Sequence, residues 1–135
     1  MESDLNLHKI LSAAAQNLLF PSEIDAPFEI NIWDKTQGLG ISSASVMELT
    51  GNKLAEYIKE TNLETLFSTP TKEQDWHSPE DKEKVKRFIG LQKIINENLK
   101  EVKVFKFGKI NILVYIVGRT PQGNIMCVST KQLQT

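Results

Sequence analysis

The stretch Ile110-Asn111-Ile112-Leu113-Val114-Tyr115-Ile116-Val117 decides the fold that the sequence predicts. It is almost entirely apolar and rich in β-branched residues, which is typical of a strand covered on both faces. We therefore expect this strand at the centre of a sheet. The segment Val102–Phe107 precedes it, and the loop Gly108-Lys109 between them predicts a hairpin with a two-residue type II′ turn.

On the other side, the central stretch leads into Thr120-Pro121-Gln122-Gly123. Proline suits the second position of a type I turn, and glycine permits a positive φ. This turn predicts a third strand over Asn124–Val128. A polar tail, Ser129–Thr135, then follows a buried strand, and a chain end held by a sheet frays less than a free one. Such a tail could hold a hydroxyl and a carboxylate at a defined place.

Two long helices are expected. Apolar residues at three- and four-residue steps predict the first over Ser3–Leu19, with Pro21 preventing its continuation. The clearest helix start lies at Ser78, an N-cap residue that is followed by Pro79. This second long helix is expected to run to about Leu99.

Shorter elements fill the middle of the chain. Alternating apolar and polar residues predict a strand over Phe28–Trp33, with Trp33 on its polar face either as a contact residue or as a rim residue beneath a loop. Ser43 is expected to cap a short helix that runs to Thr50 and stops at Gly51. Another short helix is expected between Thr61 and Phe67.

These elements predict an α+β fold with one domain over residues 1–135. The sheet is expected to be mostly antiparallel, with about four strands and helices packed on both faces. The two long helices are the expected covers, one on each face. A hydrophobic fraction of 40% and a charged fraction of 24% fit a globular protein of this length.

Composition also bears on location and partners. The single cysteine, Cys127, is expected to be a buried apolar residue in a reducing compartment. No apolar run approaches the ~20 residues of a membrane span, and the start of the chain lacks signal-peptide character, so we expect a cytoplasmic protein. Residues 1–81 hold 14 acidic and 5 basic side chains, whereas residues 82–135 hold 3 and 11. An acidic face would favour a basic partner, a basic half could suggest nucleic acid, and mixed solvated surfaces would suggest neither.

Catalytic and metal-binding patterns are poorly supported. His8 is expected on a helix surface, and His77 near Asp75 resembles a base and its orienting acid, but no nucleophile accompanies it. Metal-ligand spacings are absent from the sequence. Glu23 and Asp25 could act as a pair of glycosidase carboxylates, although any two surface acids would look the same.

Three features favour presentation to a protein partner. Glu23 lies in a loop bracketed by prolines, which restrict its conformations. Trp76, an aromatic residue in a polar stretch, lies next to Asp75. Thr135 ends a tail that follows a core strand. Buried aromatic anchors and preorganised charges are typical of binding hot spots. Each feature also has a plain alternative: a solvated acid, a tryptophan packed over a helix start, and a disordered tail.

Four stretches occur in a specific order, and they are Leu18–Glu23 with Pro27-Phe28-Glu29, Gln74-Asp75-Trp76, Val114–Gly118 with Thr120–Asn124, and Ser129–Thr135. In their order and spacing the chain resembles, over nearly its full length, the nuclease A inhibitor family. These small bacterial proteins block sugar-non-specific nucleases of the ββα-metal type.

The resemblance implies an α-β-α sandwich and a mode of inhibition. An acidic side chain after the first helix, here Glu23, would enter the nuclease active site in place of the scissile phosphate. The terminal threonine, here Thr135, would reach the catalytic Mg²⁺ of the nuclease. An Asp-Trp pair, here Asp75 and Trp76, would make a second contact that adds strength and specificity.

The same resemblance implies a protein without catalytic residues and without a cofactor, because the metal belongs to the nuclease. We expect no direct binding of nucleic acid, no membrane association, and a monomer before complex formation. The chain departs from the family at Ile24, where a small polar residue is commoner, and at Ala26, where an aromatic residue often occurs. The alternative is a protein–protein interaction module of the same fold with a non-nuclease partner.

Overall fold

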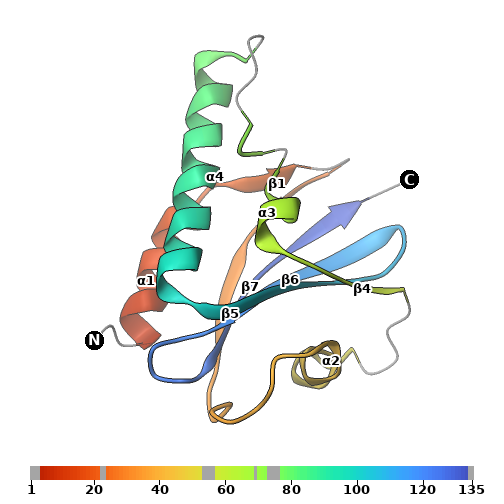
Figure 1. Cartoon of the computed structure of the whole chain (residues 1–135). Helices are drawn as coiled ribbons and strands as arrows, with labels where there is room; N and C mark the ends of the chain where they lie inside the picture. The colour runs from red at the N-terminus through yellow and green to blue at the C-terminus, as the bar shows by residue number, and fades with distance from the viewer. Residues whose placement is uncertain (1–3, 22–23, 53–56, 69, 73–76, 134–135) are drawn as a thin grey trace.

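The computed structural model describes residues 4–21, 24–52, 57–68, 70–72 and 77–133. Within them lie the helices and strands shown in Figure 1. In chain order they are α1 (Asp4–Ala15), β1 (Leu19–Pro21), β2 (Asp25–Pro27), β3 (Glu29–Trp33), α2 (Ser43–Thr50), β4 (Ile58–Thr61), α3 (Leu63–Leu66), α4 (Pro79–Asn98), β5 (Lys100–Phe107), β6 (Asn111–Arg119) and β7 (Ile125–Leu133).

The main sheet has five strands in the order β3-β7-β6-β5-β4, and every neighbouring pair is antiparallel. The predicted central strand is confirmed, because β6 lies in the middle. The expected number of about four strands was too low, since β4 was missed and β1 and β2 form a separate two-stranded sheet. These three strands are three or four residues long and largely exposed, so they carry too few buried positions to show a period.

The two long helices lie on the same face of the sheet, contrary to the expected arrangement (Figure 1). Their apolar stripes meet each other and the sheet, with Leu7 and Leu11 of α1 and Leu91 and Ile95 of α4 all fully buried. The opposite face is covered by α2, whose Val46 belongs to a second, smaller core. Helices therefore lie against both faces, but unequally, and part of the α2 face stays open.

The first helix ends at Ala15, four residues before the predicted end. Asn17 has a left-handed backbone with φ of 58°, which a helix interior does not allow. Arg87 of α4 stabilises this early end, because its guanidinium donates to the carbonyl oxygens of Ala14 (3.1 Å) and Gln16. Residues Leu19–Pro21, which lie beyond the end of the helix, form β1.

The helix starts follow capping chemistry closely. Ser78 caps α4 as predicted, and its hydroxyl accepts from the backbone N–H of Asp81 while the Asp81 carboxylate accepts from the backbone N–H of Ser78. The caps of α2 and α3 are Ser42 and Asn62, each one position from the residue that the sequence favoured. None of the described helices is long and apolar enough to span a membrane.

The loop between β5 and β6 is longer than predicted. Phe107 pairs with Leu113, so residues 108–112 lie between the paired positions, rather than the two residues of a type II′ turn. Glycine is still required at the start of this loop. Gly108 has φ of 118°, and a Cβ there would lie 2.3 Å from the backbone oxygen of Asn111.

The third strand continues beyond its predicted end. The turn at its start is confirmed by the 2.9 Å hydrogen bond from the N–H of Gly123 to the oxygen of Thr120. Strand β7 then runs to Leu133, which pairs with Asn111 of β6. The stretch 129–133, expected to be a polar tail, is therefore a paired strand, because a strand needs only backbone partners and tolerates polar side chains on an open face.

Candidate partner-binding site

The four residues predicted to bind a partner, Glu23, Asp75, Trp76 and Thr135, all lie outside the described residues. The structure does describe the segments that adjoin them. These segments are the β1–β2 hairpin, the start of α4 and the end of β7. They define how much of the candidate site is anchored in the fold.

The β1–β2 hairpin is anchored by a buried centre. Pro21 pairs with Asp25, so the segment that contains Glu23 connects two antiparallel strands. Phe20 and Ala26 form the next pair, and both are 4% exposed. The Phe20 ring lies 6.4 Å from that of Phe67, within an aromatic group of the main core.

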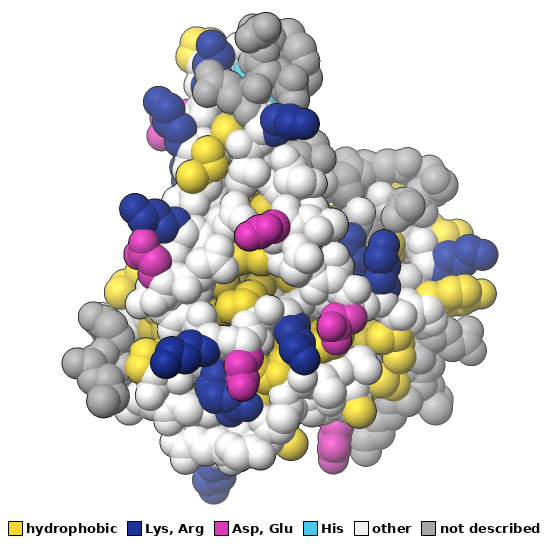
Figure 2. Space-filling model, in the orientation of Figure 1, with side chains coloured by type: hydrophobic (Ala, Val, Ile, Leu, Met, Phe, Trp, Pro, Cys, Tyr) yellow, Lys and Arg dark blue, Asp and Glu magenta, His cyan; other side chains and the backbone are white. Residues whose placement is uncertain are grey.

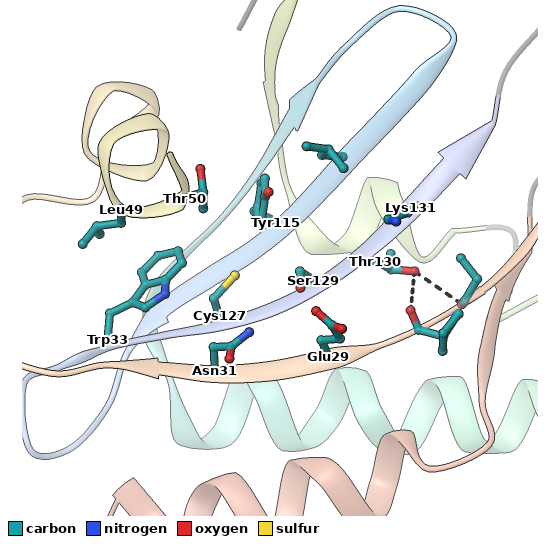
Figure 3. Close-up of a pocket in the computed structure, with 13 residues that line it drawn as sticks. Glu29, Asn31, Trp33, Leu49, Thr50, Tyr115, Cys127, Ser129, Thr130 and Lys131 are labelled. Carbon is teal, nitrogen blue, oxygen red and sulfur yellow. Dashed lines mark hydrogen bonds between the residues drawn. The ribbon is translucent and has the colours of Figure 1, made fainter. Parts of the chain in front are cut away.

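Strand β7 is tied to the same hairpin through Thr130. Its hydroxyl, which is buried, donates toward the carbonyl oxygens of Pro27 (3.0 Å) and Ala26 (3.4 Å), as the dashed lines in Figure 3 show. This contact joins residues that are more than one hundred positions apart in sequence. The end of β2 and the last part of β7 therefore hold a fixed relation to each other.

The start of α4 presents a carboxylate that stays charged. Hydrogen bonds from Ser78 are the largest cause that lowers the pKa of Asp81, and the nearby charges of His77 and Lys84 lower it further. The charge also suits the positive end of the helix. His77 immediately follows the predicted contact residue Trp76 in sequence.

A pocket of about 390 Å³ lies between the hairpin and α4. We call it the hairpin–helix pocket. Pro21 and Asp25 contribute from the hairpin, His77 and Lys84 from the α4 side. Residues near Glu23 and Trp76 in sequence, Asp25 and His77, thus border one pocket, although the two predicted contact residues are distant in sequence.

A second pocket, of about 490 Å³, lies on the open part of the α2 face of the sheet (Figure 3). Trp33 and Tyr115 line it with Cys127, and Glu29 and Lys131 stand at its polar part. Burial raises the pKa of the Cys127 thiol far above its ordinary value, so the cysteine behaves as the apolar residue that was predicted and not as a nucleophile.

The histidines do not assemble a catalytic group among the described residues. His8 is partly buried rather than a free surface residue, and its Nε2 lies 2.9 Å from the carbonyl oxygen of Ile30 on the edge strand β3. Its Nδ1 lies 3.4 Å from the hydroxyl of Ser12. Over the part of the chain that the structure describes, no three potential metal-ligating side chains of His, Cys, Asp or Glu gather together.

The charge difference between the two halves of the sequence does not produce a surface of one sign on the face seen in Figure 2. There, acidic and basic side chains alternate over α4 and the sheet. On this face a charged partner would therefore meet groups of both signs rather than a broad surface of one sign.

Sequence reasoning missed two parts of this site. The sequence predicted a helix end at Leu19 and a loop over Ser22–Pro27 in place of the β1–β2 hairpin, although a proline at the C-terminal end of each strand, Pro21 and Pro27, is compatible with an exposed edge. The role of Thr130 carried no local signal, because its partners lie at the other end of the chain.

Comparison with known proteins gives a family for this arrangement. The model of the family described as nuclease A inhibitor-like protein matches residues 5–135, which is nearly the whole chain. No curated protein matches the chain.

Proposed function

Because this chain belongs to the nuclease A inhibitor-like family, we propose that it inhibits a sugar-non-specific DNA and RNA endonuclease of the ββα-metal type. The family match over residues 5–135 is the observation that carries the proposal. Membership implies a non-catalytic protein whose partner is a nuclease. The proposal includes a mechanism with three contacts, made by Glu23, by Thr135 and by the pair Asp75 and Trp76.

Glu23 acts as the mimic of the scissile phosphate. A nuclease site is built to hold a phosphodiester, with a hard cation and hydrogen-bond donors directed at its oxygens. A carboxylate supplies negative charge and oxygen ligands but no bond that the nuclease can cleave. The support from the fold is the anchored hairpin, in which Pro21 and Asp25 on either side of this segment are paired and Phe20 is buried.

Thr135 reaches the catalytic Mg²⁺ of the nuclease with its oxygen atoms. The metal is part of the nuclease, so the inhibitor contributes ligands and needs no ion of its own. Support comes from β7, which is paired with β6 up to Leu133 and tied to the hairpin by Thr130. A short connection to a fixed strand reduces the entropy that binding must remove.

Asp75 and Trp76 form a second contact, away from the nuclease active site. A tryptophan contributes a large apolar surface, and an adjacent carboxylate directs it toward a basic region of the partner. The support is their position in sequence, directly before the anchored start of α4.

Titration into a Mg²⁺-dependent, sugar-non-specific nuclease tests the proposal, with plasmid degradation as the readout. The wild type should inhibit stoichiometrically. Glu23→Gln and a chain lacking Thr135 should each inhibit far less well. Glu29→Gln is the matched control, because Glu29 is an exposed glutamate on β3 outside the hairpin, and it should inhibit like the wild type.

The outcomes separate the parts of the proposal. Full inhibition by the chain lacking Thr135 would remove Thr135 from the mechanism and leave the function with Glu23 and the Asp75–Trp76 pair. Equal loss in Glu23→Gln and Glu29→Gln would contradict phosphate mimicry at Glu23. No inhibition by the wild type of any nuclease of this class would favour the alternative, an interaction module of the same fold with another protein partner.

A further inference from the structure

The hairpin–helix pocket combines an apolar floor with a charged rim. Leu18, Val85 and Phe88 line its floor and are 2%, 5% and 3% exposed, respectively. The rim carries the carboxylate of Asp25 from β2 and the carboxylate of Asp81 from α4. An apolar floor with few charged groups at the mouth is the composition of a site that takes one amphipathic side chain.

The pocket lies where a partner would cover it. Asp25 is two positions from Glu23, and His77 directly follows Trp76. A protein that contacts both the hairpin and the start of α4 would cover the pocket that lies between them. Covering an open pocket without filling it would leave a void at the interface, and well-packed interfaces avoid voids.

The rim selects a positive charge. Asp81 stays ionised because Ser78 donates hydrogen bonds to it, and Lys84 lies close enough to lower the pKa of Asp81 through its charge. Among the described residues, neither Asp25 nor Asp81 forms an ion pair with Lys84. The formal charges of Asp25, Asp81 and Lys84 at the mouth sum to −1.

We propose that this pocket receives a lysine or arginine side chain of the inhibited nuclease, with the aliphatic stem on Val85 and Phe88 and the cationic head at Asp25. This inference rests on the proposed function, because it takes the partner to be an enzyme that binds a polyanion. Such an enzyme carries lysine and arginine residues around its active-site cleft. Both side chains combine a hydrocarbon stem with a charged end, as the pocket requires.

Two substitutions of opposite expected effect test the inference. Asp25→Asn removes the Asp25 charge from the rim and should raise the Kd for the nuclease about tenfold, the range of a modest interfacial charge pair. Lys84→Gln removes the competing cation and should lower the Kd by about threefold or more. The matched control is Lys86→Gln, because Lys86 is an exposed lysine on the same helix that does not line the pocket.

The Lys86→Gln control separates an effect at the pocket from an effect of net charge, because both glutamine variants change the net charge by the same amount. Tighter binding by Lys84→Gln than by Lys86→Gln, together with weaker binding by Asp25→Asn, would support a cationic occupant. Equal binding by the two glutamine variants, or unchanged binding by Asp25→Asn, would overturn the inference. Thermal melts of each free variant show whether it is folded.

The experiment distinguishes this inference from the function on which it rests. If the wild type inhibits the nuclease but the three variants behave alike, the function stands and the pocket assignment fails. Stronger binding by Asp25→Asn would point to an acidic occupant and would also refute the assignment. If the wild type does not inhibit, both proposals fall together.

Discussion

Thr130 offers a direct test of how the β1–β2 hairpin is held. Thr130→Val keeps the shape of the buried side chain but removes its hydroxyl. A hydroxyl has one proton, so the contacts with Pro27 (3.0 Å) and Ala26 (3.4 Å) are one shared hydrogen bond rather than two. The substitution therefore removes one donor and leaves two carbonyl oxygens without it.

The expected loss of stability follows from the free-energy cost of leaving a buried carbonyl oxygen without its hydrogen-bond donor. A typical intramolecular hydrogen bond contributes about 1 kcal/mol net, and a buried acceptor left unsatisfied costs about 1–3 kcal/mol. The added methyl group returns roughly 0.8 kcal/mol of apolar burial. We expect Thr130→Val to lower the free energy of unfolding by about 1–2 kcal/mol, and to weaken nuclease inhibition because the hairpin is less constrained.

Urea unfolding followed by tryptophan fluorescence measures this loss, and an unchanged m-value would show that the denatured state is unaffected. Thr120→Val is the matched control. Thr120 is similarly buried, but its hydroxyl has no hydrogen-bond partner in the part of the chain that the structure describes. The control should be neutral or stabilise by up to about 1 kcal/mol. Equal stabilities of the two variants would refute the reasoning that Thr130 anchors the hairpin.

Three further predictions concern stability. Gly108→Ala should destabilise by at least about 2 kcal/mol in urea unfolding, because its Cβ would collide with backbone at a positive φ, whereas Gly90→Ala, in open space within α4, should stabilise by roughly 0.5–1 kcal/mol. Arg87→Met should cost about 1–3 kcal/mol in the same assay, because two carbonyl oxygens at the end of α1 lose a charged donor, and Lys86→Met should change little. Asp81 has a folded pKa below its ordinary 3.8, so its stabilising contribution is present above that pH and is lost as the pH falls through the folded value. The difference in melting temperature between the wild type and Asp81→Asn should therefore be present at neutral pH and disappear in acid, and a difference that grows in acid would contradict this sign.

The features that sequence predicted well are those set by neighbouring residues. The start of α4 depends on Ser78 and Pro79, which act within one helical turn, and it was placed correctly. The central position of β6 follows from a run with almost no polar side chain, which only a doubly covered strand accommodates. The turn at Thr120–Gly123 was predicted from its own residue types.

The features that sequence did not predict depend on distant partners. The apolar stripe of α1 shows that one side of this helix is buried. It does not show that α4 packs beside α1 on the same face of the sheet. The register that pairs Phe107 with Leu113 is set by the whole β5–β6 ladder and by β4, not by the glycine alone. Within the candidate site, the bond between Thr130 and Pro27 spans 103 positions, which no local pattern encodes.

Because the chain is synthesised from its N-terminus, the β3–β7 pairing limits how early the sheet can be completed. Among the described strands β3 pairs with β7 alone, and β7 is the last of these strands in chain order. A nascent chain that ends before Ile125 lacks both the partner of β3 and the anchor of the hairpin. Such distant pairings also slow folding after release. The β3–β7 pairing and the Thr130 anchor of the hairpin should therefore form only after β7 has left the ribosome.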